Sequence, residues 1–278
     1  MAKSQLNSRT FWQSKGSLRG VPVFLYHGIA RTNNQRTRAG GRKYCITYEQ
    51  FRGHLEVIQS QKYVVSTLGS LWHAGRVSDE ANWTTIITFD DGHASDYEAA
   101  LPLLQQFGYR AEFFVNPSTV NRPGFLSWPQ IAEMHRAGMS FQSHGWDHVD
   151  LRALSSPELY HQLRDSKREL QGRLGADVDV LSAPYGLVNR RIIDAALEVG
   201  YRAVCCSRSW PAQPGNCLIN RVAVYSRTTT GQAQRLLRGN PWSYAAKLAR
   251  AGLVCIPRQL LLSFWPELLT VRKSGAEA

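Results

Sequence analysis

Two pairs of side chains in this sequence have the types and spacing needed to hold a metal ion and to move a proton beside it. Asp90 and Asp91 are adjacent and are followed by Gly92. His144 and His148 are four residues apart, so their imidazoles can converge on one helical turn or in one loop. Two imidazole nitrogens and one carboxylate oxygen are a common ligand set for catalytic zinc, and they leave positions open for water and substrate.

Each half of this pattern also has a simpler interpretation. Asp followed by Gly is frequent in turns, so Asp-Asp-Gly alone indicates no more than a turn or a helix cap. A single histidine is more often a hydrogen-bonded structural residue than a ligand. The metal interpretation is favoured because the histidine pair follows a strand end one β/α unit beyond the Asp-Asp-Gly segment.

The elements that must position these residues are strands that end directly before them. Residues 84–89, TTIITF, form an apolar and β-branched run that is typical of a parallel strand buried on both faces. A second apolar run, VPVFLY at residues 21–26, ends directly before His27. Loops that leave the carboxyl edge of an α/β sheet commonly form the ligand site, so we expect His27 and both aspartates at that edge.

Strands and helices alternate along most of the chain. Thr47 and Gln50 form a capping-box signature that begins a helix extending to about residue 59, and Ser127 is expected to cap a helix that ends near residue 137. The other predicted elements are strands at 63–65, 111–115, 139–142, 178–182 and 201–205, and helices at 94–107, 157–174 and 190–199. This alternation predicts an α/β fold with a parallel sheet, in the form of a distorted (β/α) barrel.

We divide the chain into three parts: a polar tail at 1–19, the α/β domain at 20–226 and a basic helical appendage at 227–278. The 278 residues are enough for one barrel-sized domain with an appendage. The last part mixes basic residues with leucine and tryptophan and is interrupted by Pro257 and Pro266. It predicts either a helix lying on an anionic membrane surface or an amphipathic helix packed on the domain.

Charge and cysteine content limit the partners and the compartment. The chain has 33 Lys and Arg against 21 Asp and Glu, and the resulting net charge of +12 indicates an anionic partner. Zinc-finger spacing and basic heptads are missing, so we expect no nucleic-acid binding. The five cysteines include no CxxC pair, and the N-terminus lacks the apolar run of a signal peptide. We therefore predict a cytoplasmic protein without a transmembrane helix, with association at the inner membrane face as a further hypothesis.

Three segments resemble the motifs of a known family. TFDDG at 88–92 and SHGWDHVDL at 143–151 look like the first two motifs of the polysaccharide deacetylases of NodB-homology type, carbohydrate esterase family 4. SAPYG at 182–186 approximates the third motif, and the opening VPVFLYHGI is similar to the start of many members. The resemblance implies a (β/α) barrel that hydrolyses the acetamide of an N-acetylated sugar with the help of a divalent metal, most often zinc.

The resemblance also implies roles for individual residues. The implied metal ligands are Asp91, His144 and His148. Asp90 corresponds to the general base, which removes a proton from water because its carboxylate is not bound to the metal. The Pro184-Tyr185 segment corresponds to the substrate-binding turn whose backbone N–H, at Tyr185, stabilises the oxyanion.

The sequence departs from the common family pattern at two points. Ser182 stands where most members have an arginine that orients the base, so another group must supply that contact. The late leucine-histidine motif of the general acid is missing, because all eight histidines lie at or before His161. In the poly-N-acetylglucosamine deacetylase branch, which acts in exopolysaccharide biosynthesis and also tends to lack the arginine, a histidine like His27 is the acid. His93 is the alternative donor, and Trp210 is either the tryptophan of a fourth motif or a core residue.

Three functions are compatible with these residues. The first is a metal-dependent N-deacetylase of an N-acetylated glycan or a lipid- or nucleotide-linked glycan precursor. The second is an amidohydrolase of the same superfamily acting on a small cyclic amide or ureide. The third is a glycan-binding homologue without turnover, which only Ser182 supports.

Overall fold

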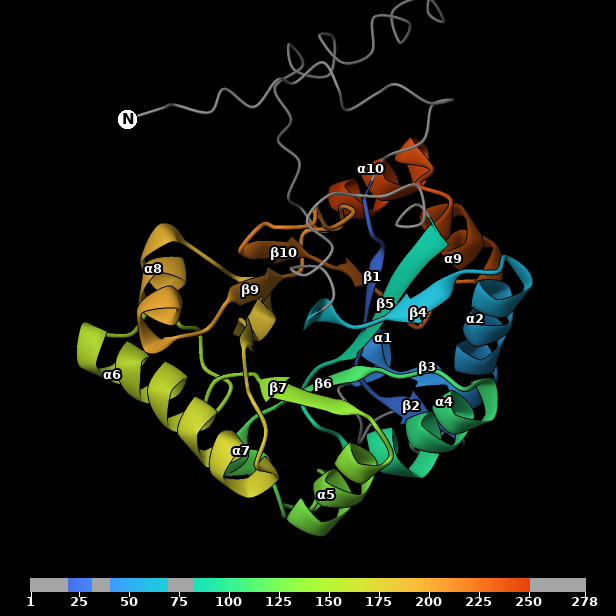
Figure 1. The fold of residues 1–278 in the computed structure, drawn as a ribbon. Helices are drawn as coiled ribbons and strands as arrows, with labels where there is room; N and C mark the ends of the chain where they lie inside the picture. Colours follow the sequence, from blue (N-terminus) through green and yellow to red (C-terminus); the bar gives the residue numbers. More distant parts are fainter. Residues whose placement is uncertain (1–19, 32–40, 70–82, 251–278) are drawn as a thin grey trace, which may run out of the picture.

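A nine-stranded parallel sheet curls into a nearly closed barrel with helices on its outer face (Figure 1). The structure is a computed structural model, and it describes residues 20–31, 41–69 and 83–250. The strands follow in the order β10 (Leu218–Asn220), β9 (Ala203–Cys206), β8 (Val180–Ser182), β7 (Ser140–Ser143), β6 (Glu112–Val115), β5 (Thr84–Phe89), β1 (Val23–Tyr26) and β11 (Val222–Ala223), and β4 (Val64–Ser66) also pairs with β5. The predicted distorted (β/α) barrel is therefore confirmed.

The two ends of this sheet meet at one residue. β10 and β11 are the last strands on opposite sides of the strand order, yet only Arg221 separates them along the chain. Because consecutive Cα atoms are about 3.8 Å apart, the two edges cannot diverge at that point. Arg221 thus lies at the seam of the barrel. Neither of these short strands was predicted from the sequence.

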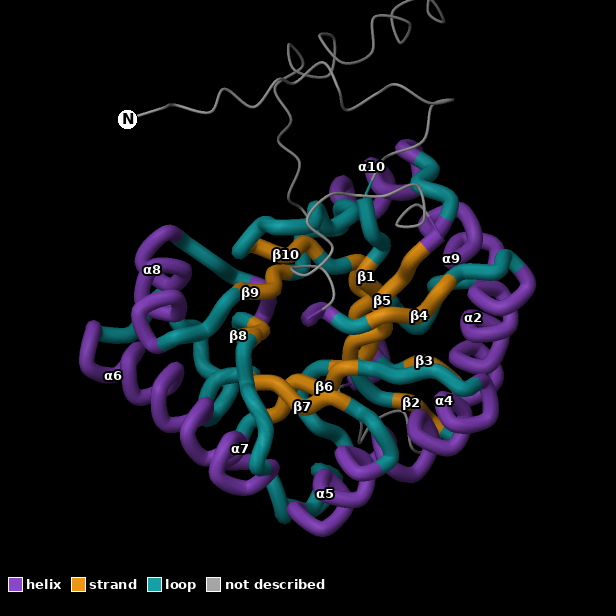
Figure 2. Tube along the Cα trace, in the orientation of Figure 1, coloured by secondary structure: helices purple, strands orange, loops and turns teal. Residues whose placement is uncertain are grey.

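Helices cover the outside of the barrel, as Figure 2 shows. They are α2 (Tyr48–Ser60), α4 (Leu101–Phe107), α5 (Trp128–Arg136), α6 (Ser156–Tyr160), α7 (Ser166–Leu174), α8 (Arg190–Val199), α9 (Thr230–Leu237) and α10 (Pro241–Arg250). Shorter elements are α1 (Gly41–Tyr44), the pair β2 (Ile29–Ala30) and β3 (Ile46–Thr47), and the 3₁₀ turns η5 (Pro117–Thr119) and η7 (Pro184–Gly186).

Local sequence signals placed most helices correctly. The capping box of Thr47 and Gln50 is present at the start of α2, and Ser127 caps α5 in the same way. Two helices predicted as continuous are instead interrupted by π-helical turns, η4 (Asp96–Ala100) before α4 and η6 (His161–Asp165) between α6 and α7. A π-turn inserts one residue into a helix and often occurs beside a functional site.

The strand residues alternate between two apolar cores. Phe24, Phe89 and Phe113 belong to a large cluster that includes the buried faces of the helices. Val23, Ile86 and other strand residues form a separate, smaller cluster. Since successive side chains of a strand point to opposite faces, the smaller cluster fills the interior of the barrel.

The described part of the C-terminal region packs on the domain. Leu236 and Leu237 of α9 and Tyr244 of α10 are buried in the large core cluster. Residues 251–278, which include Pro257 and Pro266, lie outside the described residues, as does the tail at 1–19. Within the described ranges, no helix is both long enough and apolar enough to cross a membrane.

Candidate metal centre and catalytic cavity

Asp90 and Asp91 follow β5 and enter different surroundings. Asp91 has a left-handed backbone with φ of 78°, and Gly92 continues the turn with φ of 69°. A Cβ atom at Gly92 would lie 2.9 Å from Cγ1 of Val115, so only glycine fits against β6 there. This tight turn directs the two carboxylates to separate partners.

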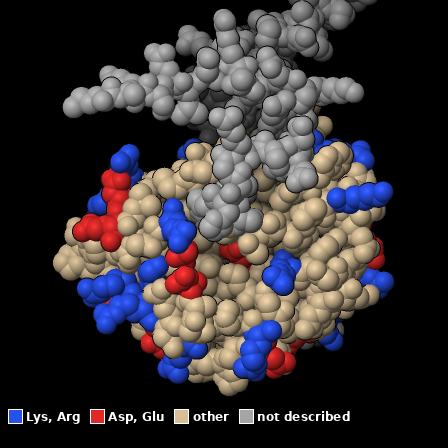
Figure 3. Space-filling model, viewed as in Figure 1, with Lys and Arg blue, Asp and Glu red and all other residues tan. Residues whose placement is uncertain are grey.

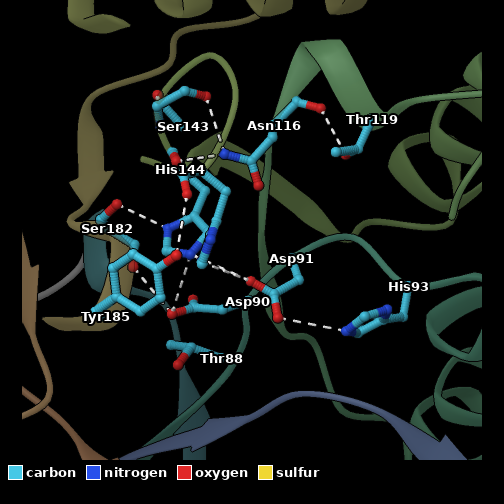
Figure 4. A network of polar contacts seen from close by, with 12 residues as sticks. Thr88, Asp90, Asp91, His93, Asn116, Thr119, Ser143, His144, Ser182 and Tyr185 are labelled. Carbon is cyan, nitrogen blue, oxygen red and sulfur yellow. Dashed lines mark hydrogen bonds and ion pairs between the residues drawn. The ribbon is translucent and has the colours of Figure 1, made fainter. Parts of the chain in front are cut away.

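His144 directly follows β7 and is held in one orientation. Its Nδ1 lies 2.8 Å from the carbonyl oxygen of Ser182, so Nδ1 carries the proton in that hydrogen bond. The lone pair of Nε2 is therefore free, and Nε2 lies 3.4 Å from Oδ1 of Asp91 (Figure 4). A second ring nitrogen fixed on a carbonyl is the usual arrangement for a metal-binding histidine.

His148 reaches the same carboxylate oxygen from the loop after β7. Its Nε2 lies 3.3 Å from Oδ1 of Asp91, and its backbone has φ of 56°. Gln162, in the π-turn η6, fixes this loop by accepting hydrogen bonds from the backbone N–H groups of Trp146 and Asp147. The π-turn thus contributes to placing the second histidine.

Asp91, His144 and His148 fit a divalent metal ion. One potential ligand atom from each lies within 4.8 Å of the others. Burial alone would lower the pKa of His144, but Asp90 and Asp91 outweigh that effect and raise it, so the centre favours additional positive charge. A cation among these atoms would satisfy the buried Oδ1 of Asp91, which lacks a hydrogen-bond partner.

Asp90 is held by a buried arginine. Arg221 donates from Nη1 to Oδ1 and from Nη2 to Oδ2 of Asp90, both at 2.7 Å. Nη2 also donates to Oγ of Ser182 at 2.7 Å, and that hydroxyl lies 3.0 Å from Oδ2 of Asp90. The side chains of Arg221 and Asp90 are 0% and 4% exposed. Burial by itself would raise the pKa of Asp90, but Arg221 and His144 lower it below the usual value, so the carboxylate remains ionised.

A cavity of about 800 Å³ opens over these groups. Its lining includes His27, both aspartates and both histidines. The His27 ring lies 4.8 Å from the ring of Tyr44, and its Nδ1 is buried without a hydrogen-bond partner. Burial lowers the pKa of His27, although Asp91 and Asp90 oppose that shift.

Comparisons with known proteins give the family. A family model described as polysaccharide deacetylase matches residues 79–204, which include both aspartates and both histidines. Residues 79–204 are therefore similar to the polysaccharide deacetylase family. YxkH of Bacillus subtilis is 26% identical over 186 residues, and the alignment covers 66% of this chain and 62% of YxkH. Peptidoglycan-N-acetylglucosamine deacetylase PgdA of Listeria monocytogenes is 30% identical over 123 residues, or 44% of this chain and 25% of PgdA. The chain therefore spans less than two thirds of these relatives.

The fold is also found in solved structures. The deacetylase PplD of Streptococcus pyogenes, in complex with acetate, superposes with a TM-score of 0.72. The two chains share 22% identity, and the match covers 80% of this chain and 99% of PplD.

Other residues singled out in the sequence lie at different distances from Asp91 and the two histidines. Tyr185 lines the cavity with φ of 61°, and its ring lies 4.7 Å from that of His148, whereas Pro184 is buried in the turn. His93 does not line the cavity; it stacks on Phe125, and its Nε2 lies 3.3 Å from Oδ2 of Asp91 on the side away from His144 (Figure 4). Trp210 packs against the core residue Tyr244, 6.2 Å between ring centroids.

Sequence reasoning missed Arg221. The sequence indicated only that some group must replace the motif arginine that is absent at Ser182. The structure shows that this group is Arg221, between β10 and β11. The available signal was the segment LINRVAV at 218–224, where a single arginine interrupts two short apolar runs. An arginine in such a segment is buried only if a carboxylate inside the fold pairs with it.

Proposed function

We propose that the chain is a metal-dependent N-deacetylase that hydrolyses the acetamide of an N-acetylated sugar in a glycan or glycan precursor and releases acetate. The observation that carries this proposal is the different environment of two adjacent carboxylates. Asp91 faces two imidazoles, whereas Asp90 is ionised, clamped by Arg221 and directed to the same cavity. Hydrolysis of an amide needs one carboxylate for the metal and another that is free to accept a proton.

The proposed roles follow from these positions. Asp91, His144 and His148 would hold the ion, and zinc suits a set of two imidazoles and one carboxylate. When bound, a divalent ion acidifies water and polarises the acetamide carbonyl. Asp90 accepts the proton of the attacking water, and Arg221 keeps the Asp90 carboxylate in place while it does so.

His27 and Tyr185 complete the proposed machinery. His27 is our candidate for delivering a proton to the departing amine. Because burial lowers its pKa, His27 would be neutral at rest, take up the proton that Asp90 removes from water and pass it to the amine. The backbone N–H of Tyr185, in the turn after β8, is the candidate donor to the oxyanion. The late histidine motif is thus unnecessary in this scheme, as in the poly-N-acetylglucosamine deacetylase branch that the sequence resembles.

Acetate release from N-acetylglucosamine oligomers tests the proposal. We expect activity that a chelator abolishes and zinc restores, and we expect Asp90→Asn to remove activity while leaving the metal bound. Asp165→Asn is the matched control, since Asp165 is on the outer surface in contact with His161 and Arg164. Turnover of a cyclic ureide in place of acetate release would favour the amidohydrolase alternative, and glycan binding without turnover would favour the non-catalytic one.

The contact between Arg221 and Asp90 weakens the case for the non-catalytic alternative, which depended on Ser182.

Peripheral association with an anionic membrane and a cytoplasmic location remain predictions from composition. A deletion that tests membrane association should begin at residue 251, because removal of α10 would also remove the buried Tyr244. Loss of sedimentation with anionic vesicles upon that deletion would support the association, and unchanged sedimentation would refute it.

A further inference from the structure

A second cavity lies beside the catalytic one. Its volume is about 390 Å³, and its lining comes from α9, α10 and the segment that precedes α9. We call it the α9–α10 cavity; its lining residues are Tyr225, Arg227, Thr228, Gln232, Arg235, Leu236, Asn240, Trp242, Ser243, Ala246 and Lys247. No acidic residue is among them, and the sequence contains no Asp or Glu at all from residue 199 to residue 266.

Two cations of this cavity are available for a ligand. Arg227 and Arg235 are exposed, and neither forms an ion pair with a carboxylate of the described residues. Lys247 projects from α10 and donates to the carbonyl oxygen of Ala223 at 2.6 Å. Elsewhere on the surface, basic side chains often have an acidic neighbour (Figure 3). One such pair is Arg190 with Asp194. Three cations without an acidic neighbour in the lining create a positive potential that favours an anion.

Tyr225 forms a wall shared by the two cavities. Its ring lies 5.4 Å from the ring of Tyr44, which in turn lies 4.8 Å from His27. The ammonium groups of Lys43 and Lys247 lie 5.4 Å and 4.9 Å from the centre of the Tyr225 ring. The two cavities therefore adjoin at Tyr225.

The cavity also has an apolar part. The indole of Trp242 is 56% exposed, and Leu236 and Ala246 contribute to the same lining. Arginine forks match the oxygens of phosphate, and an exposed tryptophan offers a flat surface to a base or a hydrocarbon chain. A neutral sugar chain would bring no negative charge to the guanidinium groups of Arg227 and Arg235.

We infer that the α9–α10 cavity binds the phosphate of an organic phosphate to which the acetylated sugar is attached, while the acetamide occupies the catalytic cavity. This inference rests on the proposed deacetylase function and specifies its substrate class. Both a nucleotide diphosphate and a prenyl diphosphate supply the required chemistry: negative charge on phosphate oxygens and an apolar group for Trp242.

The test compares substrates with and without phosphate in the full-length, zinc-loaded protein. The double variant Arg227→Gln/Arg235→Gln removes two cations from the cavity and none from the catalytic groups. Arg238→Gln is the matched control, because Arg238 follows α9, bonds to Gln61 and does not line the cavity. The substrates are an N-acetylglucosamine trimer, UDP-N-acetylglucosamine and farnesyl-diphospho-N-acetylglucosamine.

We expect the double variant to raise KM for the phosphate-bearing substrate about tenfold, with kcat unchanged, because two charge-assisted contacts at a partly exposed site are lost. KM for the neutral trimer should not change, and Arg238→Gln should leave all constants as in the wild type. The diphosphate substrate that the wild type prefers identifies the carrier, and Trp242→Ala should raise KM for that substrate alone. Equal KM values for the double variant and the wild type, or an equal rise in Arg238→Gln, would overturn the inference.

A direct binding measurement tests this inference independently of the proposed deacetylase activity. UDP and farnesyl diphosphate are titrated calorimetrically into the wild type and both variants, with zinc present in every sample so that any phosphate bound to the metal contributes equally. Tighter binding to the wild type than to the double variant supports the cavity even if no acetate is released. Equal binding to all three proteins refutes the cavity whether or not the trimer is deacetylated.

Discussion

Replacing Arg221 by methionine should destabilise the protein and disable the proposed base together. Methionine keeps an unbranched apolar side chain, but it is shorter than arginine and lacks the guanidinium. Asp90 would then keep the Ser182 hydroxyl at 3.0 Å and His144 Nε2 at 3.9 Å, and it would lose both 2.7 Å contacts from Arg221. Breaking a fully buried ion pair from one side costs about 3–5 kcal/mol, because the remaining charge is left without compensation. We expect that loss in the free energy of unfolding at neutral pH.

The same change should alter the pH dependence in a defined direction. In the wild type, the contacts from Arg221 and His144 outweigh burial and lower the pKa of Asp90. Without Arg221, burial should dominate and raise that pKa, so the carboxyl binds a proton more readily when folded. The instability of the variant should therefore be largest at high pH and diminish as the pH falls through the raised pKa. The acidic limb of the pH–rate profile should move to higher pH by about one unit or more.

Urea unfolding at pH 5 and pH 8, together with a pH–rate profile of acetate release, measures both effects. Two double variants sharpen the comparison. Asp90→Asn/Arg221→Met removes both charges and should recover most of the lost stability, although it remains inactive. Ser182→Arg/Arg221→Ser moves the guanidinium to the position that most family members use and should recover part of the activity. If the free energy of unfolding of Arg221→Met lies within about 1 kcal/mol of the wild-type value and the acidic limb of the pH–rate profile does not move, the proposed role of Arg221 in holding Asp90 is refuted.

Three further predictions concern histidines. His148→Gln should lower zinc affinity about a hundredfold or more in a competition titration, while the exposed His161→Gln should not change it. His27→Ala should reduce kcat about a hundredfold and leave the zinc content unchanged; an equal loss of zinc would exclude the proton-donor role. Burial lowers the pKa of His54 to about 4, so this group should cost about 3 kcal/mol of stability as the pH falls from 7 to 4, because the unfolded chain binds its proton first. His54→Gln should flatten that part of the stability profile in urea titrations.

Local signals in the sequence were enough for most of the fold. The capping residues Thr47 and Ser127 fixed the starts of two helices, and apolar β-branched runs identified β1 and β5. The convergence of Asp91 with His144 and His148 also followed from strand order, because successive parallel strands bring their carboxyl ends to one edge. These features depend on neighbours in sequence or on strands close together in the sheet, because only β6 lies between β5 and β7.

Features that depend on contacts between distant parts of the chain could not be predicted from the sequence in this way. The π-turns in η4 and η6 retain helical periodicity on both sides, so the pattern of apolar residues does not reveal them. β10 and β11 have three and two residues, which is too short for an alternating pattern. Arg221 is 131 residues from Asp90 in the chain, and nothing local indicates that its partner lies across the barrel.

The position of Arg221 at the barrel seam has a consequence for biosynthesis. Asp90, Asp91 and both metal-site histidines are synthesised before Arg221, and the interval between Asp90 and Arg221 is 131 residues. At ordinary translation rates that interval lasts on the order of 10 s. A nascent chain could gather its metal ligands during this time, but its buried base would have no counter-ion until β10 and β11 joined the two sheet edges. Chains terminated before residue 221 should therefore lack a positioned base, so that competence for catalysis coincides with completion of the barrel.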